Sequence, residues 1–226
     1  HRMDDDVPLV IADLNPHHLL SLRNRGEAGF VACGTNCTIV PAALPLKPLW
    51  DFIGLDKVSI STEQSLSGGG IELLSVYRET GEYPIEIPGE AEKMHDECLS
   101  LLGRAQTDSV KPANLPVEIF VKRVSREYGH IVNVSAILHF EKEQAEVIEW
   151  MQNYRSRAQA LDLPSAPELP FMLVDDLIPD SLPNPANNLK SGMAVRVSDV
   201  HVSGTTITFK AWSENTIRGA AGGTVL

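Results

Sequence analysis

Short stretches of alternating polar and apolar residues constrain the fold of this chain more than any other feature. Residues 57–62, 117–124 and 131–140 alternate in this way. Because successive side chains of a strand point to opposite faces of a sheet, this pattern predicts strands that bury one face. A polar turn joins the second and third stretches, and Ser203-Gly204 joins residues 192–202 to 205–212. We therefore predict two antiparallel hairpins, and an α+β arrangement for the middle and the end of the chain.

The first part of the chain has a different pattern. Residues 7–12 and 29–33 are short apolar runs typical of buried strands, and Asn15-Pro16 begins a short helix between them. A strand, a helix and a strand in succession predict an α/β unit with parallel pairing.

A helix is predicted over residues 37–53, although this stretch contains three prolines. Pro41 fits the first turn, where the missing backbone donor costs no hydrogen bond. Pro45 and Pro48 should kink the helix or break it in two, and the sequence leaves that choice open.

Further helices are predicted from a 3.6-residue apolar period. They cover residues 90–102, with Met94, Cys98, Leu101 and Leu102 on one face, and residues 142–157, with Val147, Ile148 and Met151 inward. Residues 163–188 form a proline- and asparagine-rich loop with a short strand at 171–174. A flexible turn is predicted at residues 67–70, and Asn215 is expected to cap a last helix.

The composition excludes several classes of function. Thirty acidic against nineteen basic residues give a net charge of −11, which repels phosphate backbones and argues against nucleic-acid binding. An anionic substrate would need a local cluster of Arg and Lys. The longest apolar runs, such as residues 7–12, are too short to span a bilayer. Both ends break off inside patterned sequence, so we expect the chain to be a piece of a longer polypeptide.

The three cysteines, Cys33, Cys37 and Cys98, do not form a disulfide framework. A reducing, cytoplasmic compartment is the simpler interpretation, and the C-x3-C spacing is a poor zinc pattern, so no metal site is predicted. Cys37 follows Thr35-Asn36 at the predicted start of a helix, where the helix dipole favours a thiolate. A buried structural thiol is the competing interpretation of Cys37.

Other residues suggest chemistry less strongly. His130 follows a turn glycine, with Arg123 seven residues earlier, and could exchange protons near neutral pH or be an exposed turn histidine. Glu90 and Lys93 share one face of a helix start, which is also ordinary capping chemistry. The small residues of 215–223 allow either a ligand or another backbone to come close.

Taken in order along the chain, these stretches resemble aspartate-semialdehyde dehydrogenases of the fungal and archaeal type. The resemblance rests on motifs that run from the nucleophile to the C-terminal glycines: Asn36-Cys37-Thr38, Thr62-Glu63-Gln64-Ser65-Leu66-Ser67-Gly68, Gly89-Glu90-Ala91-Glu92-Lys93-Met94, Arg123 with Gly129-His130, and residues 215–225. Each motif alone is weak, but their common order is specific.

The resemblance implies a fold and a domain division. It implies the catalytic and dimerisation domain of the glyceraldehyde-3-phosphate-dehydrogenase-like type, with a mixed, largely antiparallel sheet and helices on one face. Residues 1–36 would be the C-terminal part of the dinucleotide-binding domain, residues 37–212 the catalytic and dimerisation domain, and residues 213–226 a helix returning to the first domain. A homodimer or a dimer of dimers is implied as well.

The resemblance also implies an activity. NADP-dependent conversion of aspartyl phosphate to aspartate semialdehyde and phosphate would proceed through a thioester on Cys37, in the synthesis of lysine, threonine and methionine. Gln64 would position the intermediate, and His130 would be the general acid/base. Arg123 would bind the carboxylate of the substrate, Glu90 would meet its amino group, and Lys93 would contact its phosphate. NADP would lie against Gly68, Asn215 and Gly219.

Several departures from the family pattern keep alternatives open. Ile131-Val132 stand where the family has Thr-Glu, Ala91 replaces an acid, and no G-x-G-x-x-G follows a strand. We therefore expect these residues alone to bind NADP poorly and to turn over little. A related acyl-CoA reductase, such as a malonyl-CoA reductase, would share the thioester chemistry. A non-catalytic dimerisation fragment is the third hypothesis, against which the set Cys37, Gln64, Arg123 and His130 argues.

Overall fold

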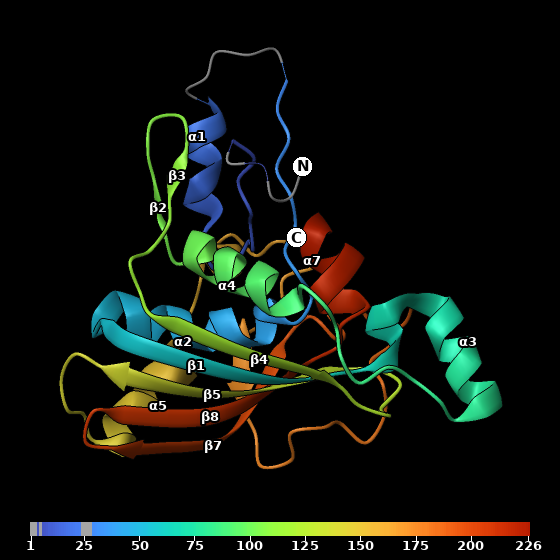
Figure 1. The fold of residues 1–226 in the computed structure, drawn as a ribbon. Helices are drawn as coiled ribbons and strands as arrows, with labels where there is room; N and C mark the ends of the chain where they lie inside the picture. The colour runs from blue at the N-terminus through green and yellow to red at the C-terminus, as the bar shows by residue number, and fades with distance from the viewer. Residues whose placement is uncertain (1–3, 5, 24–28) are drawn as a thin grey trace.

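A computed structural model describes residue 4 and residues 6–23 and 29–226 (Figure 1). The expectation that the N-terminus belongs to a longer polypeptide concerns residues 1–3 and 5 in part, and these lie outside the described residues. The helices are η1 (Pro16–Leu19), α1 (Leu20–Arg23), α2 (Ile39–Phe52), η2 (Leu66–Gly69), α3 (Gly70–Thr80), α4 (Glu90–Leu101), α5 (Gln144–Asn153), α6 (Arg157–Ala160), η3 (Ile217–Ala221) and α7 (Gly222–Val225). The strands are β1 (Leu55–Gln64), β2 (Arg104–Ala105), β3 (Val110–Lys111), β4 (Val117–Arg123), β5 (His130–Leu138), β6 (Phe171–Leu173), β7 (Val195–Ser203) and β8 (Thr206–Ser213).

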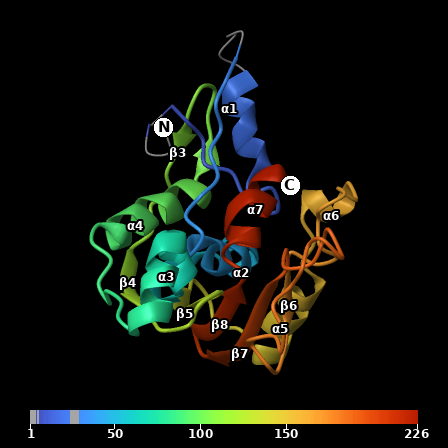
Figure 2. The ribbon, with the colours of Figure 1, turned by 90° about the vertical axis from the view of Figure 1, so that its right-hand side faces the viewer.

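A mixed sheet is the centre of the fold. Within the described residues it has six strands in the order β4-β1-β5-β8-β7-β6, and only the outer pairs β4–β1 and β7–β6 are parallel. A layer of helices covers one face, with α2 lying between α4 and α5 (Figure 2). This architecture confirms the predicted α+β class and the largely antiparallel sheet.

The sheet topology corrects one predicted hairpin. Residues 117–124 and 131–140 do form strands, but β4 and β5 lie on opposite sides of β1 and do not pair with each other. The alternation predicted both strands correctly, because it depends only on which side chains are buried. The partner of each strand was predicted wrongly, because alternation carries no information about which neighbour completes the ladder. The second predicted hairpin, β7 with β8, is confirmed.

Helix α2 continues through its prolines. Pro45 and Pro48 both lie inside it, so the helix is not broken in two. Both are buried, as are most residues of α2, from Ile39 to Leu49. Because this helix is packed between the sheet and its neighbouring helices, burial of apolar surface on nearly all sides offsets the hydrogen bonds that the prolines lack.

The N-terminal strands were predicted wrongly as continuous strands. Among the described residues of this region, the pairing is a single parallel bridge between Leu9 and Cys33. The direction of pairing agrees with the prediction, but Phe30 and Val31 are 69% and 52% exposed instead of buried. An apolar run alone does not make a strand, since a strand also needs a neighbour along its full length.

Two helical regions differ from the predicted ones. The turn predicted at residues 67–70 is the 3-10 helix η2, and it leads directly into α3, which was not predicted. Helix α3 extends away from the body of the molecule and buries only Leu74 fully (Figure 1). The helix predicted over 142–157 ends at Asn153, and the short helix α6 begins four residues later.

The last helix begins differently from the prediction. Asn215 does not cap it, because η3 begins at Ile217 and its first backbone N–H donates to Glu214 Oε2 at 2.6 Å. Arg218 of η3 forms a buried ion pair with Asp13, which ties the two ends of the chain together. No helix among the described residues is long and apolar enough to cross a membrane.

Candidate active site

One edge of the sheet gathers the predicted catalytic residues. The C-terminal ends of β1 and β4 meet there, because the two strands are parallel and Gln64 lies opposite Arg123. The N-terminal end of β5 reaches the same edge, because β5 is antiparallel to β1. His130 opens β5 and lies opposite Ser213, the last residue of β8. Residues that are far apart in the sequence thus share one edge.

Cys37 reaches this edge from the turn that precedes α2. The turn is held by Asn36, whose Oδ1 accepts from the Thr38 N–H at 2.8 Å. The Asn36 N–H in turn donates to Glu97 Oε2 at 2.6 Å. Helix α2 begins at Ile39, two residues later than predicted, so Cys37 stands just before the helix. It is half-buried.

The sulfur of Cys37 and the imidazole of His130 are in direct contact. Sγ lies 3.1 Å from Nε2. His130 is fully buried, which excludes the exposed turn histidine considered from the sequence. A thiol in contact with an imidazole is an arrangement that can support nucleophilic acyl transfer.

Two glycines lie beside this pair. Gly219 packs so closely on Cys37 that a Cβ at position 219 would overlap Cys37 Cβ. Gly68 is exposed and lies over the imidazole, where a Cβ would stand 2.9 Å from His130 Cε1 and 3.1 Å from Nε2. Small residues here let the backbone approach the reactive pair.

His130 is held in its neutral form. Burial lowers its pKa from 6.5 to about 3, and the positive charges of Arg126 and Arg123 act in the same direction. At neutral pH the ring is therefore uncharged.

Arg123 is a buried cation with free hydrogen-bonding capacity. Its side chain is 9% exposed, and Nε and Nη1 have no hydrogen-bond partner within the part of the chain that the structure describes. Burial lowers the pKa of Arg123, while the charges of Glu90 and Cys37 oppose that change. A guanidinium with open donors suits a planar carboxylate, which it can bind through two parallel hydrogen bonds.

Glu90, at the start of α4, lies between the turn that carries Cys37 and strand β1. Its Oε1 accepts from Asn36 Nδ2 at 2.7 Å and from Gln64 Nε2 at 3.3 Å. Gln64 is therefore brought into the cluster. Lys93 lies one turn further along α4 and is exposed, with no ion pair to the described residues.

Asn215 is bound into a buried network. Its Oδ1 accepts from the Gly129 N–H at 2.8 Å and lies 3.1 Å from Ser65 Oγ. Its Nδ2 donates to Ser67 Oγ at 3.0 Å. The amide is 4% exposed, so in this structure its hydrogen bonds are made within the protein.

Several residues of the site were not predicted from the sequence. Ser65 contacts His130 Nδ1, and Ser67 contacts Asn215. Ser65 directly follows β1 and Ser67 lies in η2, at the edge where the site lies, but that edge is not visible without the topology. Glu97 left a clearer signal: it is a carboxylate on the apolar face of α4 that carries Met94 and Cys98, and it is fully buried.

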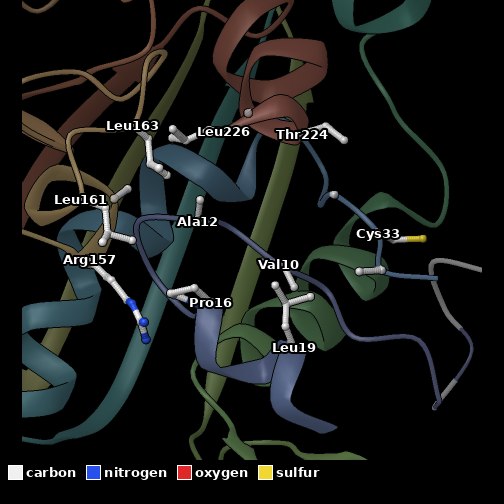
Figure 3. A pocket seen from close by; sticks show the side chains of 14 residues that line it. Val10, Ala12, Pro16, Leu19, Cys33, Arg157, Leu161, Leu163, Thr224 and Leu226 are labelled. Atoms are coloured by element: carbon white, nitrogen blue, oxygen red, sulfur yellow. The ribbon is translucent and has the colours of Figure 1, made fainter. Parts of the chain in front are cut away.

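A separate apolar pocket of about 500 Å³ lies beside the N-terminal segment (Figure 3). Its wall includes Val10, Leu19, Cys33, Leu161 and Leu226. Cys33 thus belongs to this pocket. No three His, Cys, Asp or Glu side chains of the described chain gather as a metal site.

Known proteins resemble this chain in sequence and in fold. No family model matches the chain. An aspartate-semialdehyde dehydrogenase of Methanothermobacter thermautotrophicus is 34% identical over all of this chain and 67% of its own length. A malonyl CoA reductase (NADP) of Metallosphaera sedula is 30% identical over all of this chain and 66% of its own. The crystal structure of the Candida albicans aspartate-semialdehyde dehydrogenase with NADP superposes with a TM-score of 0.81 at 25% identity, over 99% of this chain and 66% of that one.

The fold is the mixed α+β fold of the aspartate-semialdehyde dehydrogenase structures. The chain belongs to the aspartate-semialdehyde dehydrogenase family and spans about two thirds of the length of these relatives.

We predict that the charge of Arg123 supports the reactivity of Cys37. Replacing Arg123→Met removes a buried positive charge near the sulfur and should slow alkylation of Cys37 by iodoacetamide several-fold at neutral pH. Arg123→Lys keeps the charge and should slow it less. Peptide mass mapping distinguishes Cys37 from Cys33 and from Cys98, whose pKa is raised to about 12 by burial. Equal rates in all three proteins would contradict the prediction.

Proposed function

We propose that this chain carries the catalytic centre of an NADP-dependent enzyme that converts aspartyl phosphate to aspartate semialdehyde and phosphate. The observation that carries the proposal is the contact between Cys37 Sγ and His130 Nε2 at 3.1 Å, beside the buried and unsatisfied guanidinium of Arg123. A nucleophile, a group for the substrate oxygen and an anion-binding cation are the parts that this reaction needs.

Cys37 acts as the nucleophile. Its sulfur attacks the acyl carbon of aspartyl phosphate, the bond from that carbon to the phosphate oxygen breaks, the thiol proton leaves with the phosphate, and a thioester forms on Cys37. After reduction, the carbon–sulfur bond breaks and its electron pair returns to sulfur as the aldehyde leaves. His130 Nε2 stands next to the sulfur, where the oxygen of the tetrahedral adduct forms.

The residues at the site fit one end of NADP. Gly68 is exposed and leaves free the position where a Cβ would crowd His130, so a flat ring can approach Cys37 over this backbone. NADP, when bound, exchanges a hydride with the carbon held on Cys37. Gly68 is our candidate for contact with the nicotinamide. Gly219 would support that contact indirectly, because it packs on Cys37, and Asn215 would do so through Ser65 and Ser67.

The substrate would be oriented by charges at the sheet edge. Arg123 would bind its carboxylate, and Glu90, already held by Asn36 and Gln64, would meet its amino group. Gln64 would lie against the intermediate. Lys93, exposed one turn away on α4, would contact the phosphate. Because the chain has a net charge of −11, such local cations are needed to attract an anionic substrate.

Replacing the nucleophile tests the proposal. In the full-length protein, Cys37→Ala should reduce the rate of NADP reduction with aspartate semialdehyde and phosphate by about a thousandfold or more, because no thioester can form. Cys33→Ser is the matched control, since Cys33 lines the separate pocket, and it should keep the parent rate. Activity that survives Cys37→Ala would exclude both this reaction and the acyl-CoA alternative.

A malonyl-CoA reductase is the second candidate, because the relative of that name is 30% identical to this chain. Ile131-Val132 differ from the dehydrogenase pattern, and both are buried in the sheet next to His130. We expect a higher kcat/KM for aspartate semialdehyde with phosphate than for malonyl-CoA, because Glu90 stands ready for an amino group that malonyl-CoA lacks. Steady-state assays of both substrates with one preparation measure this ratio, and the reverse order would favour the alternative.

We further propose that two copies of the chain associate through the face of the sheet that no helix covers. Ser59, Ser135 and Thr208 lie side by side across its centre and line a shallow hollow. Ser135→Arg should shift the protein towards monomer in sedimentation equilibrium, because it places a charge in the middle of this face. Thr107→Arg, on the exposed connection between β2 and β3, is the control. A parent protein that is monomeric at micromolar concentration would contradict the proposal.

A further inference from the structure

Arg126 lies in the loop between β4 and β5 and connects the ends of two strands. Its Nε donates to the carbonyl oxygen of Gly129 at 2.8 Å, and its Nη2 donates to the carbonyl oxygen of Glu63 at 3.0 Å. Glu63 is the last residue but one of β1, and Gly129 directly precedes His130 at the start of β5. The planar guanidinium therefore joins the end of β1 to the residue before the histidine.

Gly129 is restrained from several sides. Its N–H donates to Asn215 Oδ1 at 2.8 Å. Its φ is +79°, in the left-handed region, and a Cβ at this position would overlap the indole of Trp212. Its carbonyl belongs to the peptide group that continues into His130. The hydrogen bond from Arg126 to this carbonyl therefore restrains the backbone of the histidine directly.

The loop that contains Arg126 also holds η2. The Leu66 N–H donates to the carbonyl oxygen of Arg126 at 2.9 Å, and the Ser67 N–H donates to that of Glu127 at 2.9 Å. Helix η2 carries Gly68, which lies over the imidazole. The same loop thus restrains the two elements that meet at the imidazole, the start of β5 and η2.

We propose that Arg126 is a positioning residue whose hydrogen bond to Gly129 fixes His130 against Cys37, while its loop fixes Gly68 over the same imidazole. The inference rests on the proposed function, in which His130 is the general acid/base at the oxygen of the tetrahedral adduct and Gly68 contacts the nicotinamide. Arg126 lies outside every motif on which the family resemblance rests, so this role does not follow from that resemblance.

Charge offers Arg126 a second route to His130. Burial lowers the pKa of His130, and the positive charges of Arg126 and Arg123 act in the same direction. Arg126→Gln and Arg126→Met both remove the charge of Arg126. The glutamine amide nitrogen can take the place of Nε and donate to Gly129, whereas methionine has no donor. A difference between these two variants therefore reports the hydrogen bond alone.

Alkylation of Cys37 by iodoacetamide compares the variants without substrate or NADP, and peptide mass mapping identifies the modified cysteine. At about pH 7, Arg126→Gln should stay within about threefold of the parent rate, because Gly129 keeps its donor. Arg126→Met should fall roughly tenfold, because the imidazole is no longer held against the sulfur.

Lys122→Met is the matched control. Lys122 lies 3.5 Å from the carboxylate of Glu63 with 53% of its side chain exposed, so this change removes a charge beside the same glutamate. It leaves the hydrogen bond to Gly129 in place and should keep the parent rate. A loss as large as that of Arg126→Met would overturn the proposal.

Equal alkylation rates in Arg126→Gln and Arg126→Met would also overturn it. Two slow variants would assign the effect to charge, and two variants at the parent rate would leave the hydrogen bond without a role. If Arg126→Met does not fold, Arg126→Gln decides by itself. The parent rate would then support the proposal, and a tenfold loss would contradict it, in keeping with the rough size of one hydrogen bond.

The ring nitrogens of His130 give a readout that a general loss of stability does not move. In folded protein with 15N-labelled histidine, Arg126→Gln should keep the parent's His130 signals, and Arg126→Met should shift them, because the ring changes its contacts with Cys37 and Ser65. His130→Gln identifies these signals by their loss. Identical His130 signals in the two Arg126 variants would contradict the positioning role.

Kinetics of the full-length protein connect the inference to the reaction. Arg126→Met should lower kcat about tenfold more than Arg126→Gln and leave the KM for phosphate within about twofold of the parent value. A protein that does not turn over aspartate semialdehyde, but whose variants differ in alkylation as expected, would disprove the function and keep the positioning role. Equal alkylation rates would remove the role of Arg126 and leave the function to the Cys37→Ala test.

Discussion

The insertion of β1 between β4 and β5 is the constraint on which the site depends. Its parallel pairing with β4 places Gln64 beside Arg123. Its antiparallel pairing with β5 brings Ser65, the residue that follows β1, next to His130. In a simple hairpin of β4 and β5, Arg123 and His130 would still be neighbours. The N–H that orients the imidazole would then be absent, because it comes from the residue that follows β1.

Buried polar groups hold the C-terminal turn, which contains Gly219, against the turn that carries Cys37. Asp13 binds Arg218 and also accepts from Ser156 Oγ at 3.2 Å and Gln159 Nε2 at 2.7 Å. A buried ion pair contributes to stability only when such extra hydrogen bonds satisfy it. Since Gly219 follows Arg218 and packs on Cys37, this ion pair holds the C-terminal turn against Cys37. Arg218 reaches Asp13 through Nη2, whereas its Nε and Nη1, like those of Arg123, have no hydrogen-bond partner within the described structure.

Much of the fold was predictable, and the errors have physical reasons. The alternation of buried and exposed residues predicted β1, β4, β5, β7 and β8, because that pattern reports burial directly. It could not predict the order of strands, which depends on contacts between distant segments. Helix α3 escaped prediction because it buries only Leu74 and follows three glycines, whose flexibility suggested a turn. The apolar residues 29–33 were wrongly predicted as a strand, since Phe30 and Val31 lie exposed in a segment that pairs only at Cys33.

The sequence by itself determined the chemical inventory of the site: a cysteine before a helix, a histidine at the start of a strand, an arginine seven residues before it, and a family resemblance that orders them. These follow from residue identity and local spacing. Only the tertiary structure decided that Cys37 touches His130, that Ser65 and Asn215 belong to the same network, and which imidazole nitrogen faces the sulfur. The reason is that hydrogen bonds between residues separated by 65 to 150 positions depend on strand order and register, which no local pattern encodes.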